Sequence, residues 1–140
     1  MPDVALTTAQ QAEYVLHFKY WAGLFCVIGH MFPCTAKFKG GKGILCSGTL
    51  LLLLDWRIAL VGWGAFVVLW LTTRYVSLGS SMAAVSLPIW GAVLGYAPAT
   101  ICPLVAITAI VVWAHRANIK KLVHGEERKF SFHHESKDSR

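Results

Sequence analysis

Residues 44–73 read ILCSGTLLLLLDWRIALVGWGAFVVLWLTT, a run in which the charged side chains are Asp55 and Arg57. The wider stretch from Gly43 to Ala114 adds one more charge, Arg74. Of the 140 residues, 56% are hydrophobic and 14% are charged, whereas soluble domains average about 25% charged residues. The sequence therefore predicts a polytopic integral membrane protein of the all-α class.

Glycines, prolines and charges divide this apolar sequence, and we expect about five membrane segments. The shortest of them, Ile44–Leu54, is too short for a full span at about 1.5 Å per residue. It could cross the membrane only if the glycine-rich residues before it were part of the span, or where the membrane is thin. The expected segments are residues 12–32, 44–54, 58–73, 82–96 and 99–114. We expect residues 1–13 to form a polar N-terminal segment, 14–128 one membrane domain, and 129–140 a polar C-terminal tail.

The net charge of +6 could suggest a nucleic-acid partner, but the basic residues lie beside the ends of apolar runs. Such residues orient a membrane protein and meet anionic lipid. If the basic loop before Ile44 is cytoplasmic, alternation puts Arg74 and the chain from His115 on the same side. All lysines and arginines except Lys19 and Arg57 are then inside. We therefore expect a bacterial inner-membrane protein with its functional face in the cytoplasm, membrane lipid as a partner and no nucleic acid.

Lys37-Phe38-Lys39-Gly40-Gly41-Lys42-Gly43 combines three lysines with three glycines, and no carboxylate lies between Glu13 and Asp55. Glycine lets backbone N–H groups approach a ligand closely, and lysine supplies positive charge. The pattern predicts an anion site, most simply for phosphate. The P-loop signature is excluded by Ala36 and Gly43 at its first glycine and its Ser/Thr position. The alternative is a loop that is basic only because it is cytoplasmic.

Because successive spans alternate in direction, cations and hydrogen-bond donors are expected to gather on the cytoplasmic face. They suit an anion better than a metal ion, and we expect no metal and no cofactor. His115 lies where a span meets the cytosol, with Asn118 one helical turn further on, so it is a candidate general base or orienting donor. Anchoring at the membrane surface is the alternative role for His115. The face comprises His30, Lys37, Lys39, Lys42, Ser47, Arg74, Ser77, Ser80, His115, Asn118, Lys120 and Lys121.

Four short stretches of the sequence, which contain many of these residues, resemble successive motifs of one family. They are GHMFP (29–33), KFKGGKG (37–43), TRYVSLGS (73–80) and HRANIKKL (115–122), the last continued by Gly125 and Glu127. Together they resemble the bacterial acyl-phosphate:glycerol-3-phosphate acyltransferases, with order and spacing in agreement over residues 21–129.

The resemblance implies a multi-pass inner-membrane enzyme that moves a fatty acyl group from acyl phosphate to the sn-1 hydroxyl of glycerol 3-phosphate, giving lysophosphatidic acid. Both substrates carry phosphate, which fits the cationic face. Oligomeric state does not follow from the sequence. The implied catalytic residues are His115, Asn118 and Ser77; the phosphate-binding residues are Lys39, Gly40, Gly41, Lys42, Gly43 and Arg74; the supporting residues are His30, Glu127 and Lys121.

The chain also departs from the family pattern. Nothing before Trp21 matches the two further helices and the Gly-Ser-Gly-Asn type motif with which the family opens. Lys121 stands where arginine is usual, and an ammonium cannot reproduce the bidentate grip of a guanidinium. Two alternatives to the enzyme therefore stay open: a shortened, non-catalytic relative that binds phosphate lipid or a partner protein, and a small anion carrier.

Overall fold

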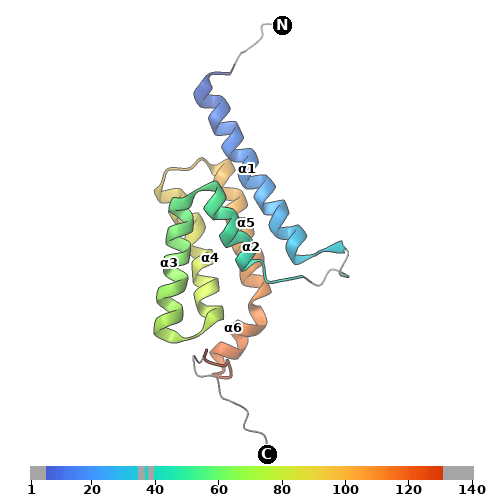
Figure 1. The fold of residues 1–140 in the computed structure, drawn as a ribbon, viewed down its shortest axis with the longest axis vertical. Helices are drawn as coiled ribbons and strands as arrows, with labels where there is room; N and C mark the ends of the chain where they lie inside the picture. The colour runs from blue at the N-terminus through green and yellow to red at the C-terminus, as the bar shows by residue number, and fades with distance from the viewer. Residues whose placement is uncertain (1–5, 35–36, 38–39, 131–140) are drawn as a thin grey trace, which may run out of the picture.

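The computed structural model describes residues 6–34, 37 and 40–130, and the regular elements within these ranges are α-helices (Figure 1). The expected all-α class is confirmed. In chain order the helices are α1 (Thr8–Met31), α2 (Ile44–Leu54), α3 (Trp56–Thr73), α4 (Val76–Val93), α5 (Pro98–Ala114) and α6 (Arg116–Val123).

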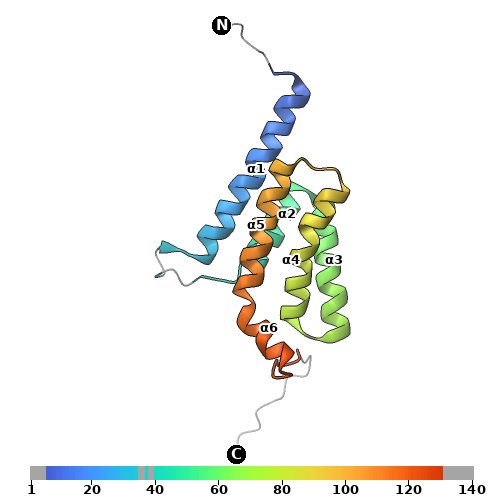
Figure 2. The ribbon, with the colours of Figure 1, turned by 180° about the vertical axis from the view of Figure 1, so that it is seen from behind.

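Helices α3 and α4 pack as an antiparallel hairpin with small residues in the interface (Figures 1 and 2). A Cβ atom on Gly79 would lie 3.1 Å from the ring of Phe66, and one on Gly62 would lie 3.2 Å from Leu87. Because small residues let helix backbones approach closely, this hairpin can form a rigid wall without large interdigitating side chains.

The start of α4 differs from the sequence prediction of a span over residues 82–96. The helix begins at Val76, because Ser77, Gly79 and Ser80 are buried rather than part of a loop. Their small side chains fit against α3, so residues that read as a polar turn in the sequence form the first two turns of a helix.

Helix α2 is short and is joined to α3 through a single residue, Asp55. The Asp55 carboxylate accepts a hydrogen bond from the Arg57 N–H (2.9 Å) and forms an ion pair with the Arg57 guanidinium (3.2 Å). The same guanidinium donates to the hydroxyl of Tyr96 (3.2 Å). Asp55 thus caps α3 and forms the turn between α2 and α3, at the end of the molecule where α4 also turns into α5.

Helix α1 lies across α2 and α5. Its Trp21 indole N–H donates to the carbonyl of Ala99 (3.0 Å), and Gly23 lies against Leu50 of α2. Phe18 and Phe25 are 74% and 65% exposed on the opposite side of α1. An apolar outer face of this kind suits contact with lipid tails rather than water.

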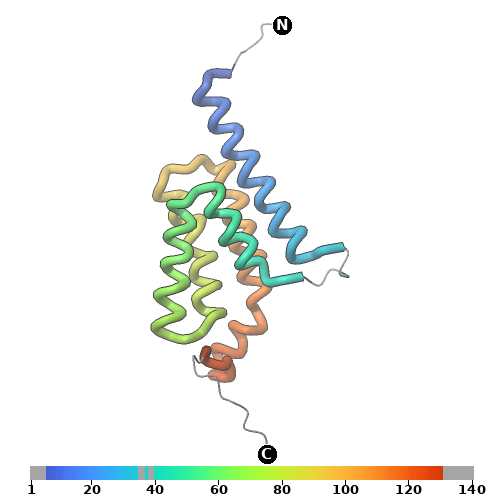
Figure 3. Tube along the Cα trace, viewed as in Figure 1, coloured from blue at the N-terminus to red at the C-terminus, as the bar shows by residue number. Residues whose placement is uncertain are grey.

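Two of the polar segments lie at one end of the helices. The tube view in Figure 3 shows the turn between α3 and α4 and helix α6 at the lower end of the helices, with the chain that enters α2 above them and below the turn between α2 and α3. The bend between α5 and α6 is 58°, with His115 at the junction. The gathering of these segments on one membrane face stays a prediction.

Two of the described helices, α3 and α4, are long and apolar enough to cross a membrane, and α5 with α6 makes a third if the bent pair counts as one span. The five expected segments all correspond to helices, but five crossings stay a prediction. Lys39 lies outside the described residues, as do the first five and last ten residues of the chain.

Candidate active site

A hydrogen bond joins the glycine–lysine segment to α6. Lys42 Nζ donates to Asn118 Oδ1 across 2.7 Å, although the two residues lie far apart in the sequence. An ammonium has three N–H donors, and the Asn118 amide group has two of its own. The pair therefore presents a cluster of donors at the polar end of the molecule, which is what a phosphate oxygen requires.

A second hydrogen bond joins α4 to the chain after α6. Ser77 is 3% exposed, and its hydroxyl donates to Glu127 Oε1. Among the described residues, the other carboxylate oxygen, Oε2, is buried with no hydrogen-bond partner. Glu127 thus brings one uncommitted acceptor into a region of donors and cations.

The segment after Glu127 is held against the α3–α4 turn. The N–H of Phe130 donates to the carbonyl of Arg74 (2.9 Å), and the Phe130 ring packs edge-on against Trp70. Arg74 adopts a left-handed conformation (φ 60°) that ends α3, which is uncommon for a residue with a Cβ. These contacts position the Glu127 segment over the start of α4.

His115 is buried, with 3% of its surface exposed, at the bend between α5 and α6. Its Nδ1 lies 2.8 Å from the carbonyl of Val111. Because a carbonyl can only accept, the proton of the neutral ring belongs on Nδ1, which leaves Nε2 as an acceptor. His115 therefore has the tautomer that a general base needs.

The glycines dock the basic segment against the end of α1. The Gly40 N–H donates to the carbonyl of Met31 (3.1 Å), and a Cβ atom on Gly40 would lie 2.6 Å from that same oxygen. On Gly41, a Cβ atom would lie 2.7 Å from His30 Nε2. Gly43 has φ +78°, a conformation that only glycine adopts without strain. Each glycine thus meets a distinct requirement for space or conformation.

Helix α2 begins directly after this segment and has no side-chain cap at Gly43. The first N–H groups of a helix have no partner within it, and they carry the positive end of its dipole. An anion held near Lys42 would meet these N–H groups as well as the ammonium.

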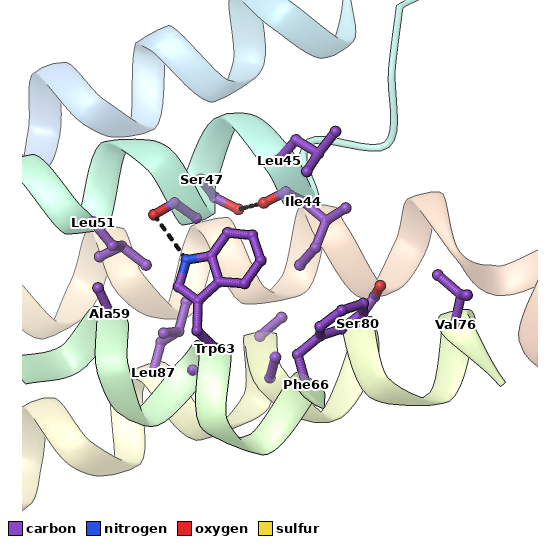
Figure 4. Close-up of a pocket in the computed structure, with 14 residues that line it drawn as sticks. Ile44, Leu45, Ser47, Leu51, Ala59, Trp63, Phe66, Val76, Ser80 and Leu87 are labelled. Carbon is purple, nitrogen blue, oxygen red and sulfur yellow. Dashed lines mark hydrogen bonds between the residues drawn. The ribbon is translucent and has the colours of Figure 1, made fainter. Parts of the chain in front are cut away.

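A cavity of about 260 Å³ lies between α2, α3 and α4 (Figure 4). Small-molecule sites typically measure about 300–1,000 Å³, so the space suits a slender ligand. Its end near Ile44 and Val76 adjoins Gly43 and Ser77 in the chain, and Leu51 and Ala59 line the other end. The wall is almost entirely apolar: Ile44, Leu45, Ser47, Gly48, Leu51, Ala59, Gly62, Trp63, Phe66, Val76, Ser80, Ala83, Ala84 and Leu87.

The structure thus brings six of the twelve sequence-predicted site residues together in pairs: Lys42 with Asn118, Ser77 with Glu127, and His30 with Gly41. Lys121 is exposed on α6, and its backbone carbonyl accepts from the Glu126 N–H (2.8 Å). Sequence reasoning missed the cavity. The spacing of Ser80, Ala83, Ala84 and Leu87 on one helix face was the available signal.

Known proteins resemble this chain in sequence and in fold. The family model described as glycerol-3-phosphate acyltransferase matches residues 4–125. A glycerol-3-phosphate acyltransferase of Pseudomonas putida KT2440 is 37% identical over 124 residues, which cover 87% of this chain and 64% of that protein. The chain therefore spans just under two thirds of the length of this curated relative.

Two solved structures share the fold. Both are crystal structures of PlsY (YgiH), an integral membrane glycerol 3-phosphate acyltransferase. The lysophosphatidic acid form has a TM-score of 0.73 and 26% identity, covering 86% of this chain and 71% of that one. The glycerol 3-phosphate form has a TM-score of 0.72 and 25% identity, covering 89% and 74%. Like these neighbours, the chain is a helical membrane protein.

Proposed function

The chain belongs to the glycerol-3-phosphate acyltransferase family, and we propose that it transfers a fatty acyl group from acyl phosphate to the sn-1 hydroxyl of glycerol 3-phosphate. The product is lysophosphatidic acid, and the reaction takes place at the cytoplasmic face of the bacterial inner membrane. The observation that carries the proposal is the Lys42–Asn118 hydrogen bond beside one end of an apolar cavity.

The polar end supplies what two phosphate groups need. Lys42 and Asn118 offer directed donors, and Gly40, Gly41 and Gly43 allow the backbone of the same segment to approach an oxyanion. Arg74 adds positive charge at the turn between α3 and α4. The glycerol-3-phosphate acyltransferase of P. putida and the glycerol 3-phosphate form of PlsY support this assignment of substrate.

The cavity supplies what a fatty acyl chain needs. Its near end is lined by Ile44, the first residue of α2, so a phosphate at the start of α2 would direct the attached chain along the helix toward Leu51. Burial of each methylene contributes about 0.8 kcal/mol, and apolar walls add this without a fixed hydrogen-bond pattern. Acyl phosphate fits because one molecule then occupies both the polar end and the cavity.

The chemistry requires one proton acceptor and one leaving group. The glycerol hydroxyl oxygen bonds to the acyl carbonyl carbon, the bond from that carbon to the phosphate oxygen breaks, and inorganic phosphate leaves. We assign the proton to His115 Nε2, because Nδ1 is committed to the Val111 carbonyl. The uncommitted Oε2 of Glu127 is suited to accept a hydrogen bond from a hydroxyl of glycerol.

The direct test is an assay of the purified protein with palmitoyl phosphate and glycerol 3-phosphate, measuring lysophosphatidic acid and phosphate. We expect both products, and we expect Lys42→Ala, Lys42→Gln and His115→Ala each to lower kcat/KM by about 10²-fold or more. Lys19→Ala, which removes an exposed lysine of α1, is the control and should behave as wild type.

Two outcomes would contradict the proposal in different ways. A folded wild-type protein that forms no product would support the non-catalytic relative. If the wild type forms product and the Lys42 and His115 variants are fully active, the proposed activity would stand, but Lys42 and His115 would not belong to its active site.

A further inference from the structure

Two cysteines lie together where α1 packs against α2. The thiols of Cys26 on α1 and Cys46 on α2 are within hydrogen-bonding distance of each other, and both are free. Cys26 is exposed and Cys46 is half-buried, so a small reagent can reach the pair. Neither thiol lines the cavity or takes part in the proposed acyl transfer.

Contacts on both sides of the two thiols fix their position. A Cβ atom on Gly23, one helical turn before the first cysteine, would lie 2.6 Å from Leu50 Cδ2. A Cβ atom on Gly43, one turn before the second cysteine, would lie 3.3 Å from Val27 Cγ1. Residue numbers rise along one helix as they fall along the other, because α1 and α2 are antiparallel (Figures 1 and 3). The two thiols thus belong to a continuous line of contacts between the helices.

The same glycines bring the two backbones close. A disulfide requires Cα atoms about 4.4–6.8 Å apart, and two helices reach that separation only where the side chains between them are small. Gly23 and Gly43 provide such positions on either side of the pair. The helices are therefore placed so that a bond between the two sulfurs needs little movement of either.

We propose that Cys26 and Cys46 form a reversible disulfide that fastens α1 to α2 when the protein meets a peroxide. The ring closed by this bond contains residues 27–45, which include the glycine–lysine segment. The inference does not rest on the proposed function, because it concerns thiols outside the candidate active site.

Hydrogen peroxide is the co-reactant of the oxidation. The sulfur of Cys26, the more exposed thiol, bonds to one peroxide oxygen as its thiolate, the O–O bond breaks, and the first water leaves with the thiol proton. Cys26 then carries a sulfenic acid. The sulfur of Cys46 bonds to this sulfur, the S–OH bond breaks, and the second water leaves with the Cys46 proton. The two thiols lose two electrons and two protons, and the peroxide is reduced to two waters.

The disulfide should hold the glycine–lysine segment more firmly. Gly40 and Gly41 dock against Met31 and His30, at the end of α1, whereas Gly43 leads directly into α2. A bond between the two helices therefore ties the docking surface of the segment to the helix that follows it. The same bond restricts the unfolded chain, which raises the stability of the fold.

The test uses a chain with Cys34→Ala and Cys102→Ala, which keeps Cys26 and Cys46 as its cysteines. Purified protein in detergent is treated with hydrogen peroxide, its free thiols are blocked with N-ethylmaleimide, and it is digested with trypsin. Cys26 then lies in the peptide of residues 20–37 and Cys46 in that of residues 43–57. Mass spectrometry should find these peptides joined with the loss of two hydrogen atoms, and dithiothreitol should separate them.

Two further measurements test what the bond does. The oxidised protein should have a Tm about 5 °C or more above that of the reduced protein. Backbone N–H groups of residues 40–43 should exchange with deuterium more slowly after oxidation. Cys26→Ala and Cys46→Ala, each made in the same chain, are the controls, and peroxide should cause none of these changes in them.

The inference fails if the folded protein keeps both thiols free after peroxide treatment, or if they oxidise separately to sulfinic acid. Joined peptides that come from two different molecules would also overturn it, and so would a disulfide within one molecule that leaves Tm and exchange unchanged. None of these measurements uses acyl transfer, so failure of this inference is distinct from failure of the proposed function.

Discussion

At the scale of single residues, the glycine–lysine segment depends on space rather than on charge alone. The φ angle of Gly41 lies outside the left-handed region, so alanine can adopt its backbone conformation, and the obstacle to a Cβ is the imidazole of His30. Gly40 differs, because the obstacles there are the backbone carbonyl groups of His30 and Met31. The two neighbouring glycines are therefore required for different physical reasons.

This difference gives a rescue experiment. Gly41→Ala should reduce acyl transfer by displacing the segment, and adding His30→Ala in the same chain should restore part of the activity by removing the obstructing ring. Gly40→Ala should not be rescued, because the backbone carbonyl groups of His30 and Met31 cannot be removed by a side-chain substitution. Gly29→Ala, at a position where a Cβ meets nothing within 4 Å, is the control. If the contact between residue 41 and the His30 ring is unimportant, steady-state assays would show the same loss of acyl transfer in Gly41→Ala with and without His30→Ala.

The sequence predicts the chemistry of this site better than its contacts. The residue types of Lys42, Asn118 and His115, with their positions beside span ends, are enough to expect an anion site at one face. The hydrogen bond between Lys42 and Asn118 could not be predicted, since it depends on how the helices at either end of the long apolar stretch pack. The sequence predicts Ser80 on the same face, but that its hydroxyl lacks a hydrogen-bond partner among the described residues is a property of the folded protein alone.

At the scale of helices, α2 and α4 define the cavity, and both differ from a simple span. Helix α2 is short, and the first two turns of α4 are made of residues that hydropathy assigns to a loop. Their small side chains leave the space between α2, α3 and α4 unfilled. Hydropathy reports where apolar sequence lies, but not where small residues leave room between helices.

The length of the cavity should therefore set the acyl chain preference. Ala59 is 1% exposed and lines the end opposite Val76, so Ala59→Leu would shorten the space at its far end. We expect kcat/KM to fall about tenfold or more for palmitoyl phosphate, and much less for octanoyl phosphate, because only the longer chain reaches that end. Overpacking costs about 1–3 kcal/mol of stability, so Tm should also fall.

Ala92→Leu is the matched control for this prediction. Ala92 is exposed on α4 and does not line the cavity, so the added side chain should leave the ratio of the two kcat/KM values unchanged. Equal losses for the long and the short substrate in Ala59→Leu would show that the acyl chain does not reach this end.

At the scale of the whole molecule, the lengths of α2 and α3 predict that, if α3 crosses the membrane, the proposed site lies within the membrane's thickness. Helix α3 has 18 residues and α2 has 11, which correspond to about 27 Å and 16 Å. Both helices meet at Asp55 and run back from it (Figure 1), so Gly43 lies roughly 10 Å short of the level of Arg74. The phosphate-binding segment would then be recessed below the membrane surface, where an acyl chain from the bilayer and a soluble phosphate can meet.

This arrangement requires Asp55 and α6 to lie on opposite sides of the membrane. The test replaces the native cysteines by alanine and adds Trp56→Cys or Lys120→Cys, two exposed positions near the two ends of the molecule. A maleimide that cannot cross membranes should label Trp56→Cys in spheroplasts and Lys120→Cys only in inverted vesicles. Helix α3 is about 27 Å long and a hydrocarbon core measures about 30 Å, so a single crossing by α3 would separate the two positions. Labelling of both positions from the same side would mean that α3 does not cross, and the recessed site would have to be abandoned.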